Sequence, residues 1–260
     1  MPGGDKAWEY YGREDPYFGV LTADQFRRDN LDAAARVAFF AAGEDLVATV
    51  LGTVTQQLEP GFCPARALDF GCGVGRLTLP LARRCEHVVG VDVSPFMLDE
   101  ARANASRAGL TNTEFVLSDD ELSRVHGSFD LVLSFIVMQH LATGRGEAIT
   151  RQLARRLVDG GVGVIQFTYA NSAPFTRRTV TAAYTHVPGL YRVHNLAKRE
   201  PWDRPPMQMN CYDLGRVFRI LQEAGCHDIH VRFTEASHYG YPVYGAVLHF
   251  AKRRLDVGRH

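Results

Sequence analysis

The sequence lacks an excess of charge of either sign, and it lacks a hydrophobic run long enough to cross a membrane. Lysine and arginine together number 29, as do aspartate and glutamate, so the formal net charge is zero. A neutral chain exerts no long-range attraction on a phosphate backbone, which disfavours a nucleic-acid partner. The apolar runs are much shorter than the roughly 20 residues of a membrane span, and residues 1–11 lack the apolar segment of a secretion signal. We therefore expect a cytoplasmic protein with no membrane partner.

Clusters of metal-binding residues are absent as well. Five cysteines lie at positions 63, 72, 85, 211 and 226, without a C-x-x-C pair or a Cys/His group at zinc spacing. An odd number of dispersed cysteines indicates free thiols in a reducing compartment. No acidic cluster offers oxygen ligands to a hard cation. The sequence therefore predicts no metal site.

What is present is the composition of an ordinary globular protein. Hydrophobic residues make up 46% and charged residues 22% of a chain of 260 residues, which suits one α/β domain with appendages. No repeat or low-complexity tract divides the chain. Four segments are expected: a helical and aromatic cap over 1–60, an α/β core over 61–169, an insert over 170–210, and a C-terminal helix with two β-rich segments over 211–260.

Strands and helices are expected to alternate through the core. Apolar runs and turn residues predict strands near 66–71, 87–92, 113–117, 129–135 and 162–169, with helices near 75–84, 95–108 and 145–158. Pro80 is expected to bend the first of these helices slightly. In the N-terminal segment, helical spacing joins Phe26, Asn30, Ala34 and Val37, and a second helix is expected over 44–58. The C-terminal segment predicts a helix over 212–224 and strands over 227–235 and 243–251.

The most informative stretch is a glycine-rich turn between two of these strands. Residues 69–75 read DFGCGVG, and a single carboxylate, Asp92, ends the next strand about twenty residues later. Glycines are needed where a chain leaves a strand, turns sharply and opens a helix against a ligand. In α/β folds, a carboxylate at this separation holds ribose hydroxyls. The stretch therefore indicates a cofactor that contains a nucleoside.

The spacing of the glycines decides between cofactor classes. A dinucleotide fingerprint, G-x-G-x-x-G, requires a third glycine at position 76, where this chain has Arg76. The pattern found, D-x-G-x-G-x-G, resembles motif I of the class I S-adenosylmethionine-dependent methyltransferases of the small-molecule type. Three further segments resemble the second, third and fourth strands of that family in the correct order: VVGVDVS at 88–94, FVLSDD at 115–120 and SFDLVLS at 128–134.

This resemblance implies a fold and a set of binding residues. The fold is Rossmann-like, with a mostly parallel sheet of seven strands, helices on both faces, and two C-terminal antiparallel strands completing the sheet. Asp92 would accept hydrogen bonds from the ribose, Asp69 would face the amino-acid end of S-adenosyl-L-methionine, and Gly71 and Gly73 would let the backbone approach it, while Gly75 would serve helix packing. The other residues expected at the cofactor are Cys72, in a packing role, Val93 and Met97 at the adenine ring, Asp119 or Asp120 at its amino group, and Phe135 where the methyl group emerges. For Met97 a core role, and for the two acids a helix-start role, remain open alternatives.

His140 follows the fourth strand and is the candidate general base, because histidine accepts a proton near neutral pH. The alternative is a structural histidine that binds a loop carbonyl. His194 and His238 also lie in segments that could reach the pocket.

The predicted function is methyl transfer from S-adenosylmethionine to an oxygen or nitrogen atom of a small molecule, without a metal. Residues 134–137 read SFIV, which is neither the Asn/Asp-Pro-Pro-aromatic tetrad of amino-methylating relatives nor the acidic ligand of metal-dependent ones. The insert is expected to cover the acceptor, a secondary metabolite or a sugar, and its aromatic and basic residues are Phe175, Arg177, Arg178, Tyr184, Tyr191, Arg192 and Trp202. The alternatives are a non-catalytic cofactor-binding protein and an NAD-dependent oxidoreductase. The oligomeric state, monomer or homodimer, is open.

Overall fold

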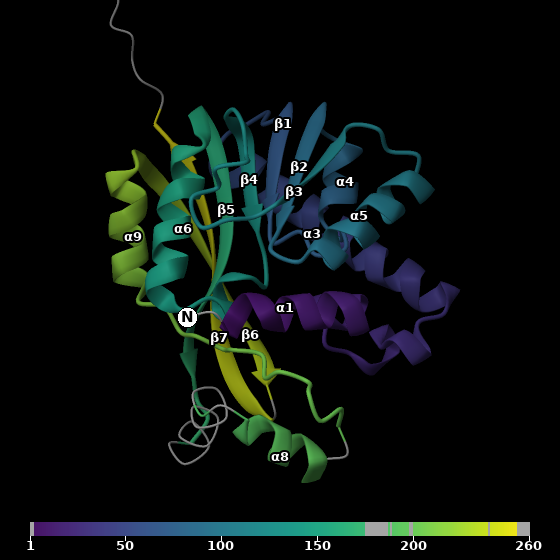
Figure 1. Cartoon of the computed structure of the whole chain (residues 1–260). Coiled ribbons are helices and arrows are strands. Elements are labelled where there is room, and N and C mark those ends of the chain that lie inside the picture. The colour runs from purple at the N-terminus through teal and green to yellow at the C-terminus, as the bar shows by residue number, and fades with distance from the viewer. Residues whose placement is uncertain (1–2, 175–186, 188, 198–199, 239, 254–260) are drawn as a thin grey trace, which may run out of the picture.

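The protein is built around one seven-stranded sheet, seen in a computed structural model that describes residues 3–174, 187, 189–197, 200–238 and 240–253 (Figure 1). The strand order is β3-β2-β1-β4-β5-β7-β6. The first five strands in the chain run parallel, and β7 pairs antiparallel with both β5 and β6. The strands are β1 (Arg66–Phe70), β2 (His87–Asp92), β3 (Thr113–Leu117), β4 (Phe129–Ser134), β5 (Leu157–Asn171), β6 (Cys226–His238) and β7 (Tyr241–Lys252). The predicted fold class is confirmed.

The central strands form because helices cover both faces of the sheet and leave no solvent-facing side. Leu131, Val132 and Leu133 of β4 are consecutive, apolar and buried, as in a parallel sheet covered on two sides. Val47, Val50 and Val54 of helix α3 (Ala33–Gln57) pack on one face, while helices α6 (Thr143–Arg155) and α9 (Leu214–Glu223) contribute Leu153 and Leu221 to the core of the other. β5 is longer than the expected 162–169, because it begins at Leu157, which pairs with Phe129 of β4, and continues along β7 to Asn171.

The two short helices between strands differ in how well the sequence predicts them. Helix α5 (Pro95–Arg107) begins as expected, with Ser94 Oγ accepting from the Met97 N–H. Helix α4 (Thr78–Ala82) is five residues long, so the expected bounds of 75–84 were too wide, and the slight bend at Pro80 stays a prediction. Gly75 has a φ of +88°, which delays the start of the helix, and Pro80 cannot donate a backbone hydrogen bond within it.

The N-terminal segment differs from the prediction of two separate helices. After α1 (Gly3–Glu14), α2 (Pro16–Val20) and the short 3₁₀ turns η1 (Asp24–Phe26) and η2 (Arg28–Asn30), one 25-residue helix, α3 (Ala33–Gln57), runs through. Gly43 lies mid-helix because a Cβ there would come within 2.2 Å of the Arg76 carbonyl oxygen. By length and hydropathy α3 could span a bilayer, but its buried stripe packs on the sheet.

Helix α1 lies across the carboxyl edge of the sheet. Its Gly12 packs on Ser94, which lies two residues after the end of β2, and the helix crosses below β1–β4 in Figure 1. Helix α8 (Leu190–Ala197), from the insert, lies below α1 in the same view. Cofactors bind at the carboxyl edge of such sheets, so the two appendages cover the edge where a site is expected. The proposed segment boundaries stay predictions.

Candidate active site

The glycine turn takes the backbone conformation that its sequence predicts. Gly71, Gly73 and Gly75 have φ angles of +75°, +52° and +88°, which favour glycine over any residue with a side chain. The Gly71 N–H donates to the Val91 carbonyl at 2.7 Å, which ties the turn to β2. A Cβ on Gly75 would lie 2.7 Å from Leu79 and 3.6 Å from Ala101, in agreement with its expected packing role.

The other two glycines also make room for protein neighbours. A Cβ on Gly71 would lie 2.2 Å from Val137, in the loop after β4, and one on Gly73 would lie 2.6 Å from Val20 of α2. These contacts bring the β4 loop and the N-terminal cap directly onto the turn. The sequence did not predict this role, because neither partner is close to the turn in the chain.

Asp92 ends β2 with its carboxylate held by two backbone groups. Its Oδ2 accepts from the Gly73 N–H at 2.9 Å and its Oδ1 from the Ser94 N–H at 2.9 Å. Burial raises the pKa of Asp92 to about 6, against the effect of the Ser94 and Gly73 hydrogen bonds. Each oxygen keeps a second acceptor site. The arrangement is suited to receiving hydroxyl donors beside the turn.

Asp69 is the next-to-last residue of β1 and is 2% exposed. Its Oδ2 accepts from Thr78 Oγ at 2.6 Å. Burial raises the pKa of Asp69 to about 6, while Thr78 and the nearby Arg76 guanidinium lower it. Arg76 is itself buried. The sequence did not predict this burial, because Arg76 was used only as evidence that position 76 lacks the third glycine of a dinucleotide fingerprint.

The predicted apolar cofactor residues fall into two groups. Cys72 and Met97 are 4% and 1% exposed and are packed among protein atoms. Met97 lies against Gly12 and Gly19 in the aromatic core of the N-terminal cap, which agrees with the alternative of a core role. Val93 and Phe135 are half-buried, and their contact with a cofactor stays a prediction.

The two acids after β3 are occupied by protein partners. Both Asp119 oxygens accept from Ser123, one from its backbone N–H at 2.8 Å and the other from its hydroxyl. These bonds lower the pKa of Asp119. Asp120 pairs with Arg145, which also pairs with Asp5 of α1. A carboxylate oxygen can accept a second hydrogen bond, so the contact of either acid with an adenine amino group stays a prediction beside the alternative of a helix-start role.

The loop after β4 contains a strained residue. Ile136 has a φ of +60°, a conformation that is rare for a β-branched side chain and that costs about 1–3 kcal/mol. Its N–H donates to Oε1 of Gln166, on the neighbouring strand β5, at 3.1 Å. Strained backbone persists where surrounding contacts hold it, and it concentrates at functional sites. Sequence reasoning did not single out Gln166.

His140 lies in a hydrogen-bonded network between the core and the insert. Its Nδ1 is 2.7 Å from the Gln208 carbonyl, which can only accept, so Nδ1 carries the proton. Nε2 therefore holds the lone pair, 3.3 Å from the side-chain nitrogen of Gln139. The ring is 8% exposed and packs against Trp8 of α1 at 4.9 Å between ring centroids. The geometry contains the expected carbonyl bond, and the basic Nε2 accepts a hydrogen bond from the Gln139 side-chain amide.

The insert and the N-terminal cap meet next to this network. Tyr11 donates to the Pro205 carbonyl at 2.8 Å, and the Arg204 guanidinium lies 5.0 Å from the centre of the Phe18 ring. Trp202 is 59% exposed, and Arg192 lies over its ring at 4.5 Å. Phe175, Arg177, Arg178 and Tyr184, which were expected to cover the acceptor, lie outside the described residues. The same holds for the side chains of His194 and His238.

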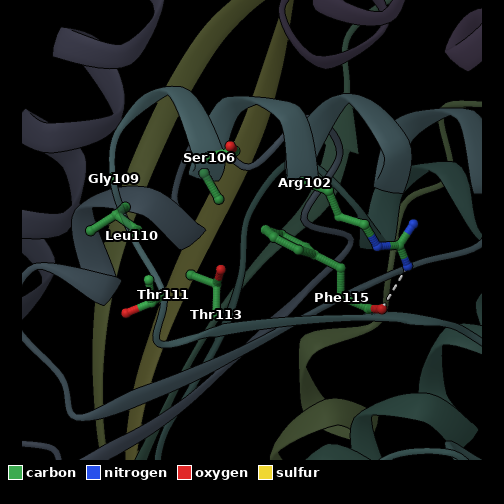
Figure 2. Close-up of a pocket in the computed structure, with 8 residues that line it drawn as sticks. Arg102, Ser106, Gly109, Leu110, Thr111, Thr113 and Phe115 are labelled. Carbon is green, nitrogen blue, oxygen red and sulfur yellow. Dashed lines mark hydrogen bonds between the residues drawn. The ribbon is translucent and has the colours of Figure 1, made fainter.

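One hollow of 320 Å³ lies away from all of these residues, between α5 and β3 (Figure 2). Arg102 donates to the Phe115 carbonyl at 2.9 Å along its wall. Its lining includes no residue of the glycine turn, and it plays no part in the site.

Comparison with known proteins identifies the core. Residues 67–161 match the family model of a methyltransferase domain. Residues 67–161 therefore form a methyltransferase domain. This methyltransferase domain spans β1 to the start of β5 and includes both Asp69 and Asp92. The family prediction made from the sequence is confirmed.

Solved structures share the fold over nearly the whole chain. Magnesium protoporphyrin IX methyltransferase from Synechocystis PCC 6803, with bound S-adenosylmethionine, superposes with a TM-score of 0.57 at 20% identity and covers 97% of this chain and 98% of that one. N-methyltransferase NodS from Bradyrhizobium japonicum WM9, with bound S-adenosylhomocysteine, gives 0.55 at 14% identity over 95% and 98%. At these identities the likeness concerns the fold.

Curated relatives match over less than a third of this chain. Ubiquinone biosynthesis O-methyltransferase from Cereibacter sphaeroides is 39% identical over 77 residues, which are 30% of this chain and 31% of that protein. A 23S rRNA (uracil(1939)-C(5))-methyltransferase from Alkalilimnicola ehrlichii is 43% identical over 81 residues, 29% of this chain and 18% of that protein. The chain thus spans between 18% and 31% of the length of these relatives.

The residues at the turn fit the cofactor of this domain family. Asp92 offers oxygen acceptors beside the turn, and the buried Arg76 guanidinium beside Asp69 has an Nε atom without a hydrogen-bond partner. A ligand with hydroxyl donors and charged groups of both signs matches this set. Among the described residues no group of three or more His, Cys, Asp or Glu side chains is placed to hold a metal.

Proposed function

We propose that this protein transfers a methyl group from S-adenosyl-L-methionine to an oxygen or nitrogen atom of a small molecule, by direct in-line displacement without a metal ion, in the cytoplasm. The observation that carries the proposal is the joining of the glycine turn to Asp92 through the Gly73 N–H, at the carboxyl edge of a methyltransferase domain. S-adenosyl-L-homocysteine is the product that follows from this reaction.

Coverage of the carboxyl edge supports a small acceptor. Helix α1 lies over the strand ends, and Trp8 packs on His140. Tyr11 binds the insert through the Pro205 carbonyl, so the cap and the insert close over the same edge. A folded nucleic acid needs an open, positively charged surface, and the net charge of the chain is zero. The rRNA methyltransferase match covers 29% of this chain and 18% of that protein, too small a share to carry its substrate over to this chain.

The protein's main contribution to methyl transfer would be to position the acceptor and to keep water away from the reacting atoms. The sulfonium cofactor, when bound, supplies an activated methyl group. Holding an acceptor in line with it at near-attack distance is worth up to about 7–11 kcal/mol. The cap residues Trp8 and Tyr11 would exclude water from the reacting atoms, which strengthens electrostatic interactions in the site.

His140 is the proposed base for an acceptor that must lose a proton. The Gln208 carbonyl fixes the Nδ1–H tautomer and leaves Nε2 as the basic atom. Gln139, which faces Nε2, is in turn held by a hydrogen bond of 3.2 Å from the Thr168 hydroxyl to its side-chain oxygen. A positioned base contributes about 10²–10⁴-fold where a proton is transferred.

A labelled-methyl transfer screen tests the proposal. Purified protein is incubated with S-adenosylmethionine labelled in its methyl group and a panel of hydroxylated and amine-bearing small molecules, with total RNA as a separate arm. Label in a small-molecule product, retained in the presence of EDTA, supports the proposal. Label in RNA alone contradicts the acceptor class, and loss of activity with EDTA contradicts the metal-independent mechanism. Binding of the sulfonium compound with no acceptor in any arm favours the non-catalytic alternative, and binding of NAD alone favours the oxidoreductase.

A further inference from the structure

The buried arginine that follows the glycine turn has no hydrogen-bond or ion-pair partner among the described residues. Arg76 is 5% exposed, and its Nε atom has no hydrogen-bond partner. Within the part of the chain that the structure describes, no ion pair joins its guanidinium to a carboxylate. A buried cation without a partner is costly, and buried charges in folded proteins are normally paired.

The neighbouring carboxylates do not fill this gap. Asp69 is close enough for its charge to act on the pKa of Arg76, but its carboxylate accepts from the Thr78 hydroxyl at 2.6 Å. Asp92 accepts from Gly73 and Ser94. The carboxylates of Asp69 and Asp92 therefore each accept hydrogen bonds from protein donors, whereas the Nε atom of Arg76 has no acceptor.

Packing constrains the main chain and the first carbons of the Arg76 side chain. The Arg76 carbonyl oxygen and Cγ would be 2.2 Å and 3.0 Å from a Cβ at position 43, so they lie against the bare backbone of Gly43 in α3. This contact holds the base of the side chain in the interior, and the residue as a whole is 5% exposed.

We propose that Arg76 receives the carboxylate of the amino-acid end of S-adenosylmethionine, with Asp69 beside it as the acceptor for the ammonium group of the same end. This inference rests on the proposed function. A guanidinium offers up to five N–H donors in a planar fork that matches a carboxylate. A ligand end that carries one negative and one positive charge satisfies both buried groups together and adds no net charge to the interior.

The matching of charges also explains why the pair is tolerated without direct contact. Burial raises the pKa of Asp69 to about 6 and lowers that of Arg76, so each group is held in a setting that disfavours its charge. A zwitterionic ligand would reverse both effects. The residue that excludes a dinucleotide at this turn would then select for the amino-acid end of the bound cofactor.

Titration calorimetry with two ligands tests this role. S-adenosylmethionine and decarboxylated S-adenosylmethionine share the adenosine, the sulfonium and the amine, and differ only in the carboxylate. Wild-type protein is expected to prefer the first by about 10- to 100-fold, as for a hydrogen bond to a charged group. Arg76→Met should remove this preference while binding the decarboxylated compound about as well as wild type does.

Two further variants complete the test. Arg76→Lys keeps the charge without the planar fork and should retain part of the preference. Arg83→Met, on an exposed arginine close by, is the matched control and should leave the preference intact. A preference that survives in Arg76→Met, or in Arg76→Lys at full size, would overturn the inference. If wild type binds neither compound, the proposed function itself fails.

Chemical unfolding without ligand provides a second readout. Because Arg76 makes no hydrogen bond through Nε, Arg76→Met should unfold at a denaturant concentration no lower than wild type does. A large loss of stability would show that the arginine is a structural element of the apo protein and would contradict its role as a receptor.

Discussion

Asp92 and Gly73, which are 19 residues apart in the chain, are joined by a 2.9 Å hydrogen bond from the Gly73 N–H to the Asp92 carboxylate. The bond ties the end of β2 to the glycine turn. Ser94 donates to the other oxygen at 2.9 Å, so the carboxylate is held on two sides before any ligand arrives. A preset acceptor costs little ordering on binding, which favours affinity.

Asp92→Asn is expected to weaken binding of S-adenosylmethionine by at least about 10-fold and to lower the free energy of unfolding by about 1–3 kcal/mol. An amide has one accepting oxygen, so its NH₂ group would face one of the two backbone N–H donors. Calorimetry and denaturant unfolding measure the two effects. Asp99→Asn, on the exposed side of α5, is the control and should change neither. Unchanged affinity in the Asp92 variant would mean that another group binds the ribose.

Asp69→Asn should stabilise the protein without ligand, and the gain should be larger at pH 7.5 than at pH 5. The pKa of Asp69 is raised to about 6, so the folded state binds a proton more tightly than the unfolded state, and the stability it contributes falls as pH rises through 6. The gain is at most about 3 kcal/mol. His249, whose pKa burial lowers to about 4, acts in the opposite sense over this range, so wild type and variant are compared at each pH. An equal gain at both pH values would show that Asp69 does not titrate there.

Gln166→Leu should lower the free energy of unfolding by about 1–2 kcal/mol, because the Ile136 N–H loses its acceptor. Gln166→Glu keeps an acceptor oxygen and should cost less. Since Ile136 is held at a φ of +60° beside the glycine turn, turnover is expected to fall more in the leucine variant than in the glutamate variant. Equal stability and turnover in both would show that the bond does not hold the loop.

His140→Gln should slow methyl transfer by about 10²-fold or more while leaving the affinity for S-adenosylmethionine within about two-fold. Glutamine can bind the Gln208 carbonyl through its amide N–H, but it has no basic nitrogen. Single-turnover kinetics and calorimetry separate the two quantities. If this variant turns over at the wild-type rate, His140 is not the general base, and its role is limited to the hydrogen bond with the Gln208 carbonyl.

The sequence predicts the central strands closely because their side chains are buried on both faces. Apolar runs such as the one in β2, which was predicted at 87–92 and found at His87–Asp92, need no knowledge of their neighbours. The conformation of the glycine turn follows for a similar reason, since positive φ angles are a local property.

Side-chain partners from distant segments could not be predicted in the same way. Asp119 accepts from Ser123, and Asp120 pairs with Arg145 from helix α6, partners that no local pattern indicated. Arg76 is buried because α3 crosses the turn at Gly43, a contact that no local pattern reveals. The same contact places Gly43 inside one long helix, where the sequence suggested a break between two.

We propose that the turn from Asp69 to Gly75 and the carboxylate of Asp92 bind S-adenosylmethionine. Calorimetric titration of the wild-type protein with S-adenosylmethionine, S-adenosylhomocysteine and NAD in separate runs tests it most directly. We predict one binding site for each of the two sulfur compounds, with micromolar or tighter affinity, and no heat of binding with NAD. Binding of NAD without binding of either sulfur compound would show that the glycine turn and Asp92 do not form an S-adenosylmethionine site.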